Sequence, residues 1–168
     1  METSKVRAIE TIIAQFKDGQ TLAIGGQTAT FMPERLIQCV LDSGVRHLTV
    51  YSIDSSDPGV GVGRLIDAGM VDRMITTHVG TNPVTSAKIN SGEMQVELCP
   101  MGSFIERVRC GGLGLGGVLT KTGLGTLVEE GKQLVTVNGE TYLLETALRA
   151  DIALTRSRRA DPIGNLAY

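Results

Sequence analysis

Apolar residues recur along the chain with two different spacings, and stretches of the two kinds alternate. Apolar side chains three and four residues apart predict α-helices, whereas short apolar runs bounded by glycine, asparagine or serine predict buried strands. The predicted helices cover residues 4–17, 33–43, 64–69, 82–90 and 103–109, with a last helical turn at 145–150. The predicted strands cover residues 21–26, 47–53, 73–80, 94–98, 133–137, 140–144 and 151–155.

Local signals refine some of these boundaries. Pro33 suits the first turn of a helix, and Ser43-Gly44 ends the same helix. Ser103-Phe-Ile-Glu106 has the spacing of a capping box, which predicts that a helix begins at Ser103 and extends to about Arg109. Asn138-Gly139 separates two apolar strands, and this dipeptide is the strongest short-range signal for a β-hairpin.

The alternation of strands and helices predicts a single α/β domain, residues 1–168, with a mostly parallel sheet and an antiparallel hairpin excursion. In such sheets, ligands bind where the carboxyl ends of strands lead into loops. Glycine is concentrated at these places, namely at Gly25-Gly26, at residues 59–63, at Gly80 and at residues 109–126. We therefore expect the functional site among these loops.

Composition and charge exclude several classes of partner. The net charge is −2 and cations form no cluster with aromatic residues, which argues against nucleic acid. The amino-terminal helix mixes charged with apolar positions, so it resembles neither a signal peptide nor a membrane span. Cys39, Cys99 and Cys110 lack the spacing of metal ligands and are expected to be buried, reduced thiols. These features favour a soluble, cytoplasmic protein without a structural metal.

The most glycine-rich stretch, Arg109 to Thr126, holds seven glycines in eighteen residues but fits no nucleotide motif. Residues 112–117 match GxGxxG formally, yet a helix precedes them where a dinucleotide site needs a strand. Gly131-Lys132 lacks the spacing of a P-loop, and Lys121-Thr-Gly123 lacks the Ser-x-x-Lys of penicillin-recognising enzymes. These glycines either shape turns and subunit packing or approach a bulky ligand closely.

The chain also lacks an obvious nucleophile, acid or base of its own. His47 is expected to be solvated or half-buried. His78 is expected to serve as a structural hydrogen-bonding residue, with lining of the site as the alternative. The acidic residues have structural interpretations: turn formation around Pro58 for Asp54 and Asp57, helix capping for Glu106, and a solvated face for Glu129 and Glu130. The chain therefore has the features of a binding half of a larger site.

Taken together, long stretches resemble the A (alpha) subunit of family I CoA-transferases, the 3-oxoacid and acetate/acetoacetate type. They include DGQTLAIGG (18–26), SGVRHLTVYSID (43–54), THVGTNP (77–83), YLLETALRADIALTRS (142–157) and GNLAY (164–168). The longest is SGEMQVELCPMGSFIERVRCGGLGLGGVLTKTGLGTLVEEGKQ, residues 91–133. The resemblance covers nearly the whole chain.

The resemblance implies an open α/β/α sheet with helices on both faces, and a hetero-oligomer with a homologous B (beta) subunit. In the family, a glutamate in a Ser-Glu-Asn-Gly segment of the beta subunit attacks the acyl-CoA, which leads to a glutamyl-CoA thioester. This chain contains no such segment, so no catalytic nucleophile is expected in it. CoA and carboxylic acids would be its substrates, as in short-chain fatty acid or ketone body metabolism, with no permanently bound cofactor and no metal. By resemblance, the residues that bind CoA are Gly25, Gly26, Gln27, Thr28, Ala29, Thr30 and Phe31.

Two departures from the family pattern affect this site. Gln27 and Phe31 stand where the family usually has phenylalanine and glycine, so Phe31 is expected to narrow or reroute the CoA loop. The family's Pro-Gln-Gly-Thr is Pro-Met101-Gly102-Ser here, next to the acyl carbonyl by resemblance. Methionine cannot donate the hydrogen bond that the glutamine would give to an oxyanion, and Gln27 is a candidate replacement from another loop.

Relatives in this family continue for several dozen residues beyond the position of Tyr168, so we expect the chain to lack C-terminal strands of the sheet. Two other functions stay open from the sequence. One is a non-catalytic scaffold or CoA-binding module that kept the fold but lost activity. The other is a sugar-phosphate isomerase, although no carboxylate or lysine base for that reaction is evident.

Overall fold

The computed structural model describes residues 4–168 and contains a five-stranded parallel sheet with strand order β4-β3-β2-β1-β8. Every neighbouring pair in this sheet is parallel, as the alternation of strands and helices predicts. The bounds are β1 (Thr21–Ile24), β2 (Leu48–Tyr51), β3 (Val71–Thr76), β4 (Gln95–Leu98) and β8 (Ile152–Leu154).

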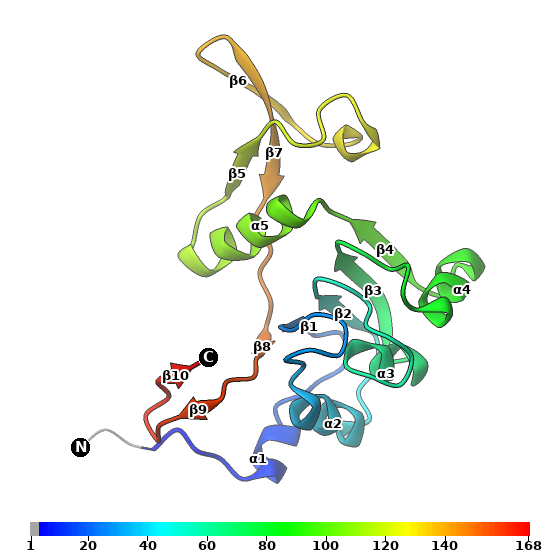
Figure 1. Ribbon diagram of the computed structural model, residues 1–168, viewed down its shortest axis with the longest axis vertical. Helices are drawn as coiled ribbons and strands as arrows, with labels where there is room; N and C mark the ends of the chain where they lie inside the picture. Colours follow the sequence, from blue (N-terminus) through cyan, green and yellow to red (C-terminus); the bar gives the residue numbers. More distant parts are fainter. Residues whose placement is uncertain (1–3) are drawn as a thin grey trace.

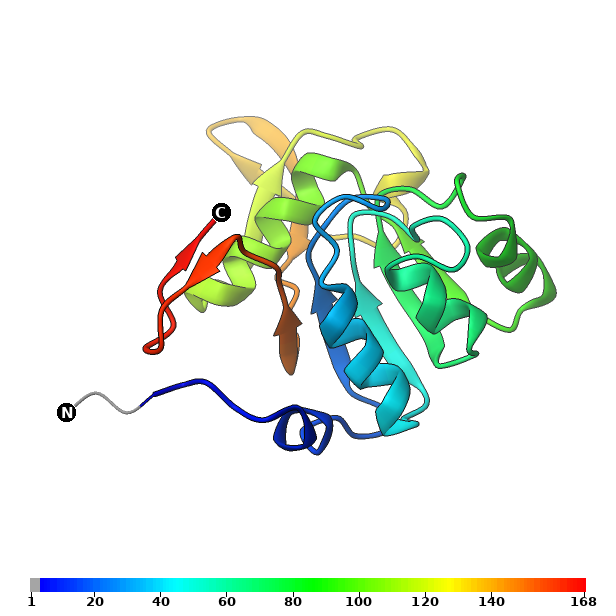
Figure 2. The ribbon, with the colours of Figure 1, turned by 60° about the horizontal axis from the view of Figure 1, so that its bottom comes forward.

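Helices lie on both faces of this sheet, so the α/β/α expectation is confirmed (Figure 2). The helices are α1 (Ile9–Ile13), α2 (Glu34–Ser43), α3 (Val62–Asp67), α4 (Pro83–Ser91) and α5 (Met101–Leu113). α1, α2 and α3 pack over one face, where side chains from the strands and helices form the main core. α5 covers part of the other face through Phe104, which packs with Ile75 and Leu148.

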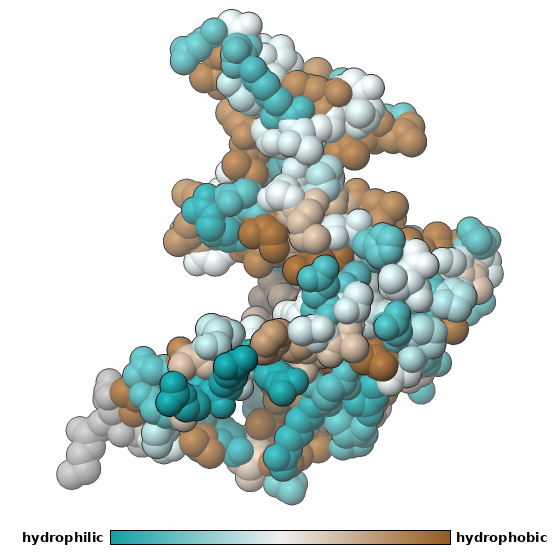
Figure 3. All heavy atoms as spheres, viewed as in Figure 1, coloured by the Kyte–Doolittle hydropathy of each residue, from teal (hydrophilic) through white to brown (hydrophobic). Residues whose placement is uncertain are grey.

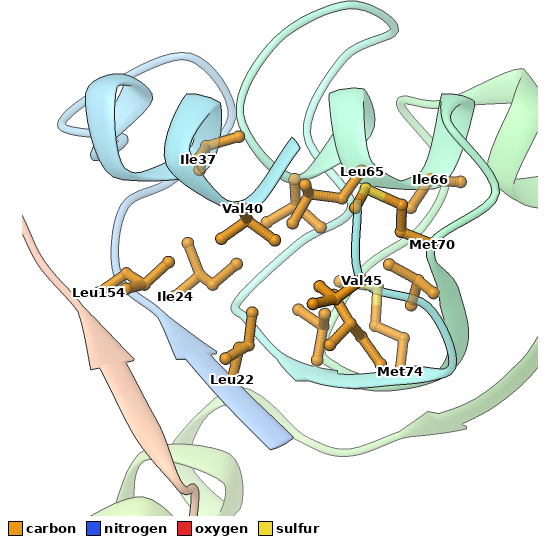
Figure 4. Close-up of a cluster of buried hydrophobic side chains, with 14 of the residues drawn as sticks. Leu22, Ile24, Ile37, Val40, Val45, Leu65, Ile66, Met70, Met74 and Leu154 are labelled. Atoms are coloured by element: carbon orange, nitrogen blue, oxygen red, sulfur yellow. The ribbon is translucent and has the colours of Figure 1, made fainter. Parts of the chain in front are cut away.

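The main core follows from the register of the parallel strands. Leu22, Val50 and Met74 are Cα partners on adjacent strands, so their side chains point to the same face. α2 and α3 contribute Val40 and Leu65 against them, and all five side chains are fully buried (Figure 4). Each such side chain contributes about 1.5–3 kcal/mol to folding by leaving water. This layer holds the strands, and therefore the loops at their ends, in place.

A second, antiparallel sheet forms the hairpin lobe, which we define as residues 117–146. It contains β5 (Gly117–Thr120), β6 (Leu134–Val137) and β7 (Glu140–Thr146), with a short 3-10 helix at Leu127–Glu129. Asn138 and Gly139 both have positive φ, at 51° and 79°, as a type I′ hairpin turn requires. The predicted hairpin is therefore confirmed, and it projects away from the main sheet beyond α5 (Figure 1). Near the C-terminus, β9 (Arg159–Ala160) pairs with β10 (Leu166–Ala167).

The predicted helix at residues 4–17 is wrong in length. Only residues 9–13 are helical, because the chain before them is extended and the Lys5 amide donates a hydrogen bond to the carbonyl of Pro162. Ile9, Ile12 and Ile13, which produced the helical periodicity, do pack against the main core. The periodicity was therefore a correct sign of burial but overestimated the helix.

Two predictions in the second half of the chain also fail. α5 begins at Met101 rather than Ser103, and Glu106 pairs with Arg109 instead of capping the helix. The helix continues to Leu113, so Gly111 and Gly112 are helical rather than part of a glycine loop. Residues 145–150 form no helical turn, because β7 continues through Thr146 in its pairing with β5.

Candidate functional site

The five strands of the main sheet are parallel, so their carboxyl ends meet at one edge. The loops that leave this edge after β1, β2, β3 and β4 contain most of the residues singled out by the sequence. The loop after β1 is the predicted CoA loop, residues 25–31. Met101 and Gly102 follow β4 at the first turn of α5. Both predicted parts of the site therefore lie at the edge where open α/β sheets bind ligands.

The CoA loop is a tight, internally bonded turn. The amides of Gln27 and Thr30 each donate a hydrogen bond to the carbonyl of the other, at 3.0 and 2.7 Å. Thr28 and Phe31 have φ values of 51° and 57°, in the left-handed region that non-glycine residues seldom adopt. Such conformations cost free energy and persist where neighbouring structure holds them, as at ligand sites.

Asp54, in the loop after β2, is what holds this turn. Its carboxylate is buried and accepts hydrogen bonds from the amides of Thr28 and Ser56, both at 2.8 Å. The bond to Ser56 is local turn chemistry, as the sequence predicts, but the bond to Thr28 links two loops twenty-six residues apart. Asp54 also forms a backbone bridge with His78, in the loop after β3. The carboxylate therefore ties the CoA loop to its neighbours, a role that no local pattern in the sequence indicates.

The start of the loop, at Gly26, is held by close packing against Met32. Gly26 has φ of 124°, and a Cβ added there would lie 2.8 Å from the sulfur of Met32. Only glycine fits this position. Beside it is a pocket of about 300 Å³, lined by Gly25, Gly26, Phe31, Thr155, Arg156 and Tyr168. Three residues predicted to bind CoA thus line a pocket; Phe31 is half-exposed, as a ligand contact requires.

Met101 and Gly102 lie apart from that pocket. β2 and β3 separate β1 from β4, so these two strands are roughly 14 Å apart at about 4.8 Å per strand. The Met101 side chain is 45% exposed, and its sulfur lies 4.0 Å from the Thr77 hydroxyl. Gly102 and Ser103 line a second pocket, of about 460 Å³, against β5. The structure therefore brings the two predicted parts to one edge without bringing them into contact.

The titratable groups that the sequence singled out do not form a catalytic cluster. His47 is exposed and pairs with Asp72 at 2.8 Å. The ring of His78 is exposed and makes no hydrogen bond within the described residues, so the expected structural role belongs to its backbone, which accepts from the Ser55 amide. All three cysteines are free and buried, as expected. Burial raises the pKa of the Cys99 thiol, and the nearby Arg107 offsets this only in part, so the thiol stays protonated and is a poor nucleophile.

A buried cluster of charges, missed at the sequence level, joins the main sheet to the hairpin lobe. Arg107 on α5 donates to the Glu97 carboxylate on β4 at 2.6 Å and to the Thr146 carbonyl on β7 at 2.8 Å. Glu145 lies 3.8 Å from Arg107 and 2.6 Å from Lys132. Arg107 and Glu145 are 5% and 1% exposed. The spacing of these residues in the sequence gives no sign that they meet.

The pKa of Glu97 reflects this cluster. Burial alone would raise it, but the hydrogen bond and charge of Arg107, together with Arg73, outweigh burial and hold the pKa below the ordinary value of a glutamate. Glu97 is therefore ionised at neutral pH and engaged by two guanidinium groups. It is unsuited to act as a proton donor, and its role is to hold the lobe.

Comparison with solved structures defines the class of fold. The acyl-CoA transferase YdiF of Escherichia coli O157:H7 has a TM-score of 0.84 at 20% identity, over 98% of this chain and 36% of that chain. Glutaconate coenzyme A-transferase from Acidaminococcus fermentans has a TM-score of 0.82 at 17% identity, over 97% of this chain and 59% of that chain. The decarboxylase AibA/AibB scores 0.82 at 22% identity, over 99% of this chain and 67% of that chain. The fold is thus that of CoA-transferases, but other chemistry also occurs on it.

Sequence comparison identifies the family. The model of the family described as coenzyme A transferase matches residues 6–168. The acetate CoA-transferase subunit alpha of Escherichia coli K12 is 48% identical over 98% of this chain and 75% of its own length. The acetoacetyl-CoA:acetate/butyrate CoA transferase alpha subunit of Clostridium acetobutylicum is 44% identical over 98% of this chain and 76% of its own length. The chain belongs to the coenzyme A transferase family, which confirms the resemblance found in the sequence.

Proposed function

We propose that this chain is the alpha subunit of a CoA-transferase that moves CoA between a short-chain acyl-CoA and a carboxylic acid such as acetate or acetoacetate. The observation that carries the proposal is its 48% identity, over almost its whole length, with a protein named as an acetate CoA-transferase subunit alpha. That relative and the one from Clostridium are both named as enzyme subunits, which favours an enzyme over the scaffold alternative.

The nucleophile of the reaction would come from a beta subunit in a hetero-oligomer. The described residues offer no clustered nucleophile and base: the thiols are buried, and the carboxylates of Asp54, Glu97 and Glu145 are engaged in hydrogen bonds or ion pairs. A carboxylate from the partner needs no base, because it is nucleophilic once desolvated and positioned. CoA and the carboxylic acid are substrates, and the mechanism needs no bound cofactor or metal from this chain.

In this mechanism, residues 25–31 form the CoA-binding loop. Their strained backbone, and the hydrogen bond that the Thr28 amide donates to Asp54, preset the loop before substrate arrives, which lowers the entropy lost on binding. The glycines let the backbone approach the thioester closely and help to exclude water, which would otherwise hydrolyse a mixed anhydride. By family resemblance, Met101 and Gly102 would lie beside the acyl carbonyl.

Within residues 4–168, no helix has both the length and the apolar character needed to cross a bilayer. We place the enzyme in the cytoplasm, as the composition predicts, and treat residues 1–168 as one domain of the complex. The exposed hydrophobic side chains Leu119, Leu127 and Leu134 of the hairpin lobe are available for contact with another chain.

Reconstitution with the purified beta subunit of a close relative tests the proposal. This chain alone should show no CoA transfer from acetyl-CoA to acetoacetate, whereas the mixed complex should turn over. Met101→Gln should then raise kcat, because one oxyanion donor contributes about 2.7–4 kcal/mol to transition-state stabilisation. Turnover by the isolated chain would overturn the split site. Absent CoA binding by a well-folded complex, measured by calorimetry, would instead favour the scaffold.

A further inference from the structure

Another pocket, at the start of α2, adjoins the pocket of the CoA loop. It has a volume of about 400 Å³ and is lined by Met32, Pro33, Glu34, Arg35, Leu36, Thr155, Arg156 and Ser157. Thr155 and Arg156 line both pockets, so the two adjoin at the carboxyl end of β8. A ligand longer than either pocket can therefore extend from the CoA loop towards the start of α2.

Two arginines, Arg35 and Arg156, line this pocket, and Arg158 and Arg159 follow Arg156 closely in the chain. Among the described residues, no carboxylate lies within ion-pair distance of Arg35, Arg156, Arg158 or Arg159, whereas Arg64, Arg73, Arg107 and Arg109 are each paired. The acidic residue of the pocket, Glu34, is already engaged by the Gly61 amide at 2.7 Å and by Arg64 at 3.1 Å. Figure 3 shows hydrophilic side chains gathered over the strip of chain that carries β9.

Arg35 and Arg156 line the same pocket, and Arg158 and Arg159 are close to Arg156 in the sequence, so the unpaired guanidinium groups form a positive region that favours an anion. Arginine also matches the planar geometry of phosphate oxygens, with two parallel donors. Arg156 is directed into the junction of the pockets, because its guanidinium carbon lies 6.0 Å from the centre of the Phe31 ring. That ring belongs to the CoA loop and is half-exposed.

We propose that Arg35 and Arg156 form a subsite for the phosphate groups of the CoA thioester. The pocket beside the CoA loop then holds the pantetheine part of the same molecule. Arg158 and Arg159 raise the positive potential through which the anionic acyl donor approaches. This inference rests on the proposed function, since it assigns the nucleotide end of the same substrate. It also assigns residues that the family resemblance did not mark.

The test compares two acyl donors in the reconstituted complex. Acetyl-CoA carries the phosphates, and acetyl-pantetheine lacks them but presents the same thioester. Arg35→Gln and Arg156→Gln should each lower kcat/KM for acetyl-CoA about tenfold, as expected for a lost charge-assisted contact, mostly through KM. Their kcat/KM for acetyl-pantetheine should equal that of the wild type. Arg149→Gln, at an arginine that lines a different pocket, is the matched control and should leave both donors unchanged.

A double variant combines Arg35→Gln with Arg156→Gln. Raising the salt concentration should weaken CoA binding by the wild type more than by this double variant, because salt screens the two arginine charges that only the wild type has. An equal loss with both donors would show that the arginines act on folding or assembly, and no loss with either would also overturn the subsite. Calorimetric binding of CoA and pantetheine to the complex gives the same comparison without turnover. If the wild-type complex binds CoA but transfers it from neither donor, the proposed function is contradicted and the subsite is not. The subsite is then tested by binding alone: the variants should lose affinity for CoA but not for pantetheine.

Discussion

The main sheet and the hairpin lobe of this chain are held together by different means. In the main sheet, aliphatic side chains of adjacent strands and of α2 and α3 form a continuous buried core. In the hairpin lobe, Leu143 is the only buried hydrophobic residue among those described, while Leu119, Leu127, Leu134 and Val137 are exposed. The lobe is joined to the rest instead by Arg107 and its buried charged partners.

This difference in packing means that the binding edge and the hairpin lobe depend on different interactions for their positions. A close-packed apolar core fixes the strands and hence the loops that form the binding edge, and it does so without a partner. The lobe has too little apolar contact of its own, so its position depends on a few directional bonds. Its exposed leucines leave a surface available to another chain. The binding edge is therefore preformed, whereas the lobe is the part whose placement depends on single residues.

Removing Arg107 should give the largest effect. Arg107→Ala leaves the buried Glu145 carboxylate with Lys132 alone and the partly exposed Glu97 carboxylate with Arg73 alone. Breaking a buried ion pair typically costs about 3–5 kcal/mol, and the remaining cations offset part of this cost. We expect this loss in the free energy of unfolding from urea denaturation. Arg109→Ala, whose partner Glu106 is exposed on the same helix, is the control and should cost under about 1 kcal/mol. Equal effects would show that the cluster does not hold the lobe.

The same cluster predicts a dependence on pH. The folded-state pKa of Glu97 lies below its unfolded value, so its contribution to stability is present above the ordinary glutamate range and is lost as the pH falls through the folded pKa. Urea denaturation at several pH values should show a steeper loss of stability in acid for the wild type than for Glu97→Gln. Identical slopes would contradict the ion pair.

On the side of the main sheet, Asp54 should matter for binding more than for folding. Asp54→Ala leaves the amides of Thr28 and Ser56 without their acceptor, at a cost of about 1–3 kcal/mol. Because the freed CoA loop is no longer preset, KM for acetyl-CoA should rise in the reconstituted complex with little change in kcat. The exposed neighbour Asp57 provides the control, Asp57→Ala, which should leave KM unchanged. A rise in KM for both variants would argue against a specific role of Asp54.

The smallest change in stability is expected at α5, which lies between the main sheet and the hairpin lobe. Two adjacent glycines of this helix, Gly111 and Gly112, allow a direct comparison. A Cβ at Gly111 would lie 1.9 Å from the Leu148 carbonyl oxygen, whereas a Cβ at Gly112 meets nothing within 4 Å. Gly111→Ala should therefore destabilise the protein by about 1–3 kcal/mol, because the backbone must shift. Gly112→Ala should stabilise it by about 0.5–1 kcal/mol through helix propensity. Thermal unfolding of the pair distinguishes them; stabilisation by both would show that the backbones do not approach so closely.

The strands of the main sheet were largely predictable, because each one is marked by the pattern of a few consecutive residues. The buried strands of this sheet appear in the sequence as short apolar runs, and in the hairpin lobe Asn138-Gly139 predicted the hairpin. The loop proposed to bind CoA was singled out through family resemblance. The contacts that hold the site were not predictable. Asp54 meets Thr28, and Arg107 meets Glu145, only after the chain has folded, and each residue taken alone has an ordinary solvated or turn interpretation. The start of α5 at Met101 was predicted two residues too late, because the apparent capping box placed it at Ser103.

The account depends on this chain supplying the binding edge for CoA while a different polypeptide supplies the attacking carboxylate. The most direct test is to mix the chain with a beta subunit, add acetyl-CoA without an acceptor acid, quench, and weigh both intact polypeptides by mass spectrometry. The account predicts that the beta subunit alone gains the mass of CoA less one water, as a glutamyl-CoA thioester, while the acetyl group leaves as acetate. A CoA adduct on the chain described here would contradict it.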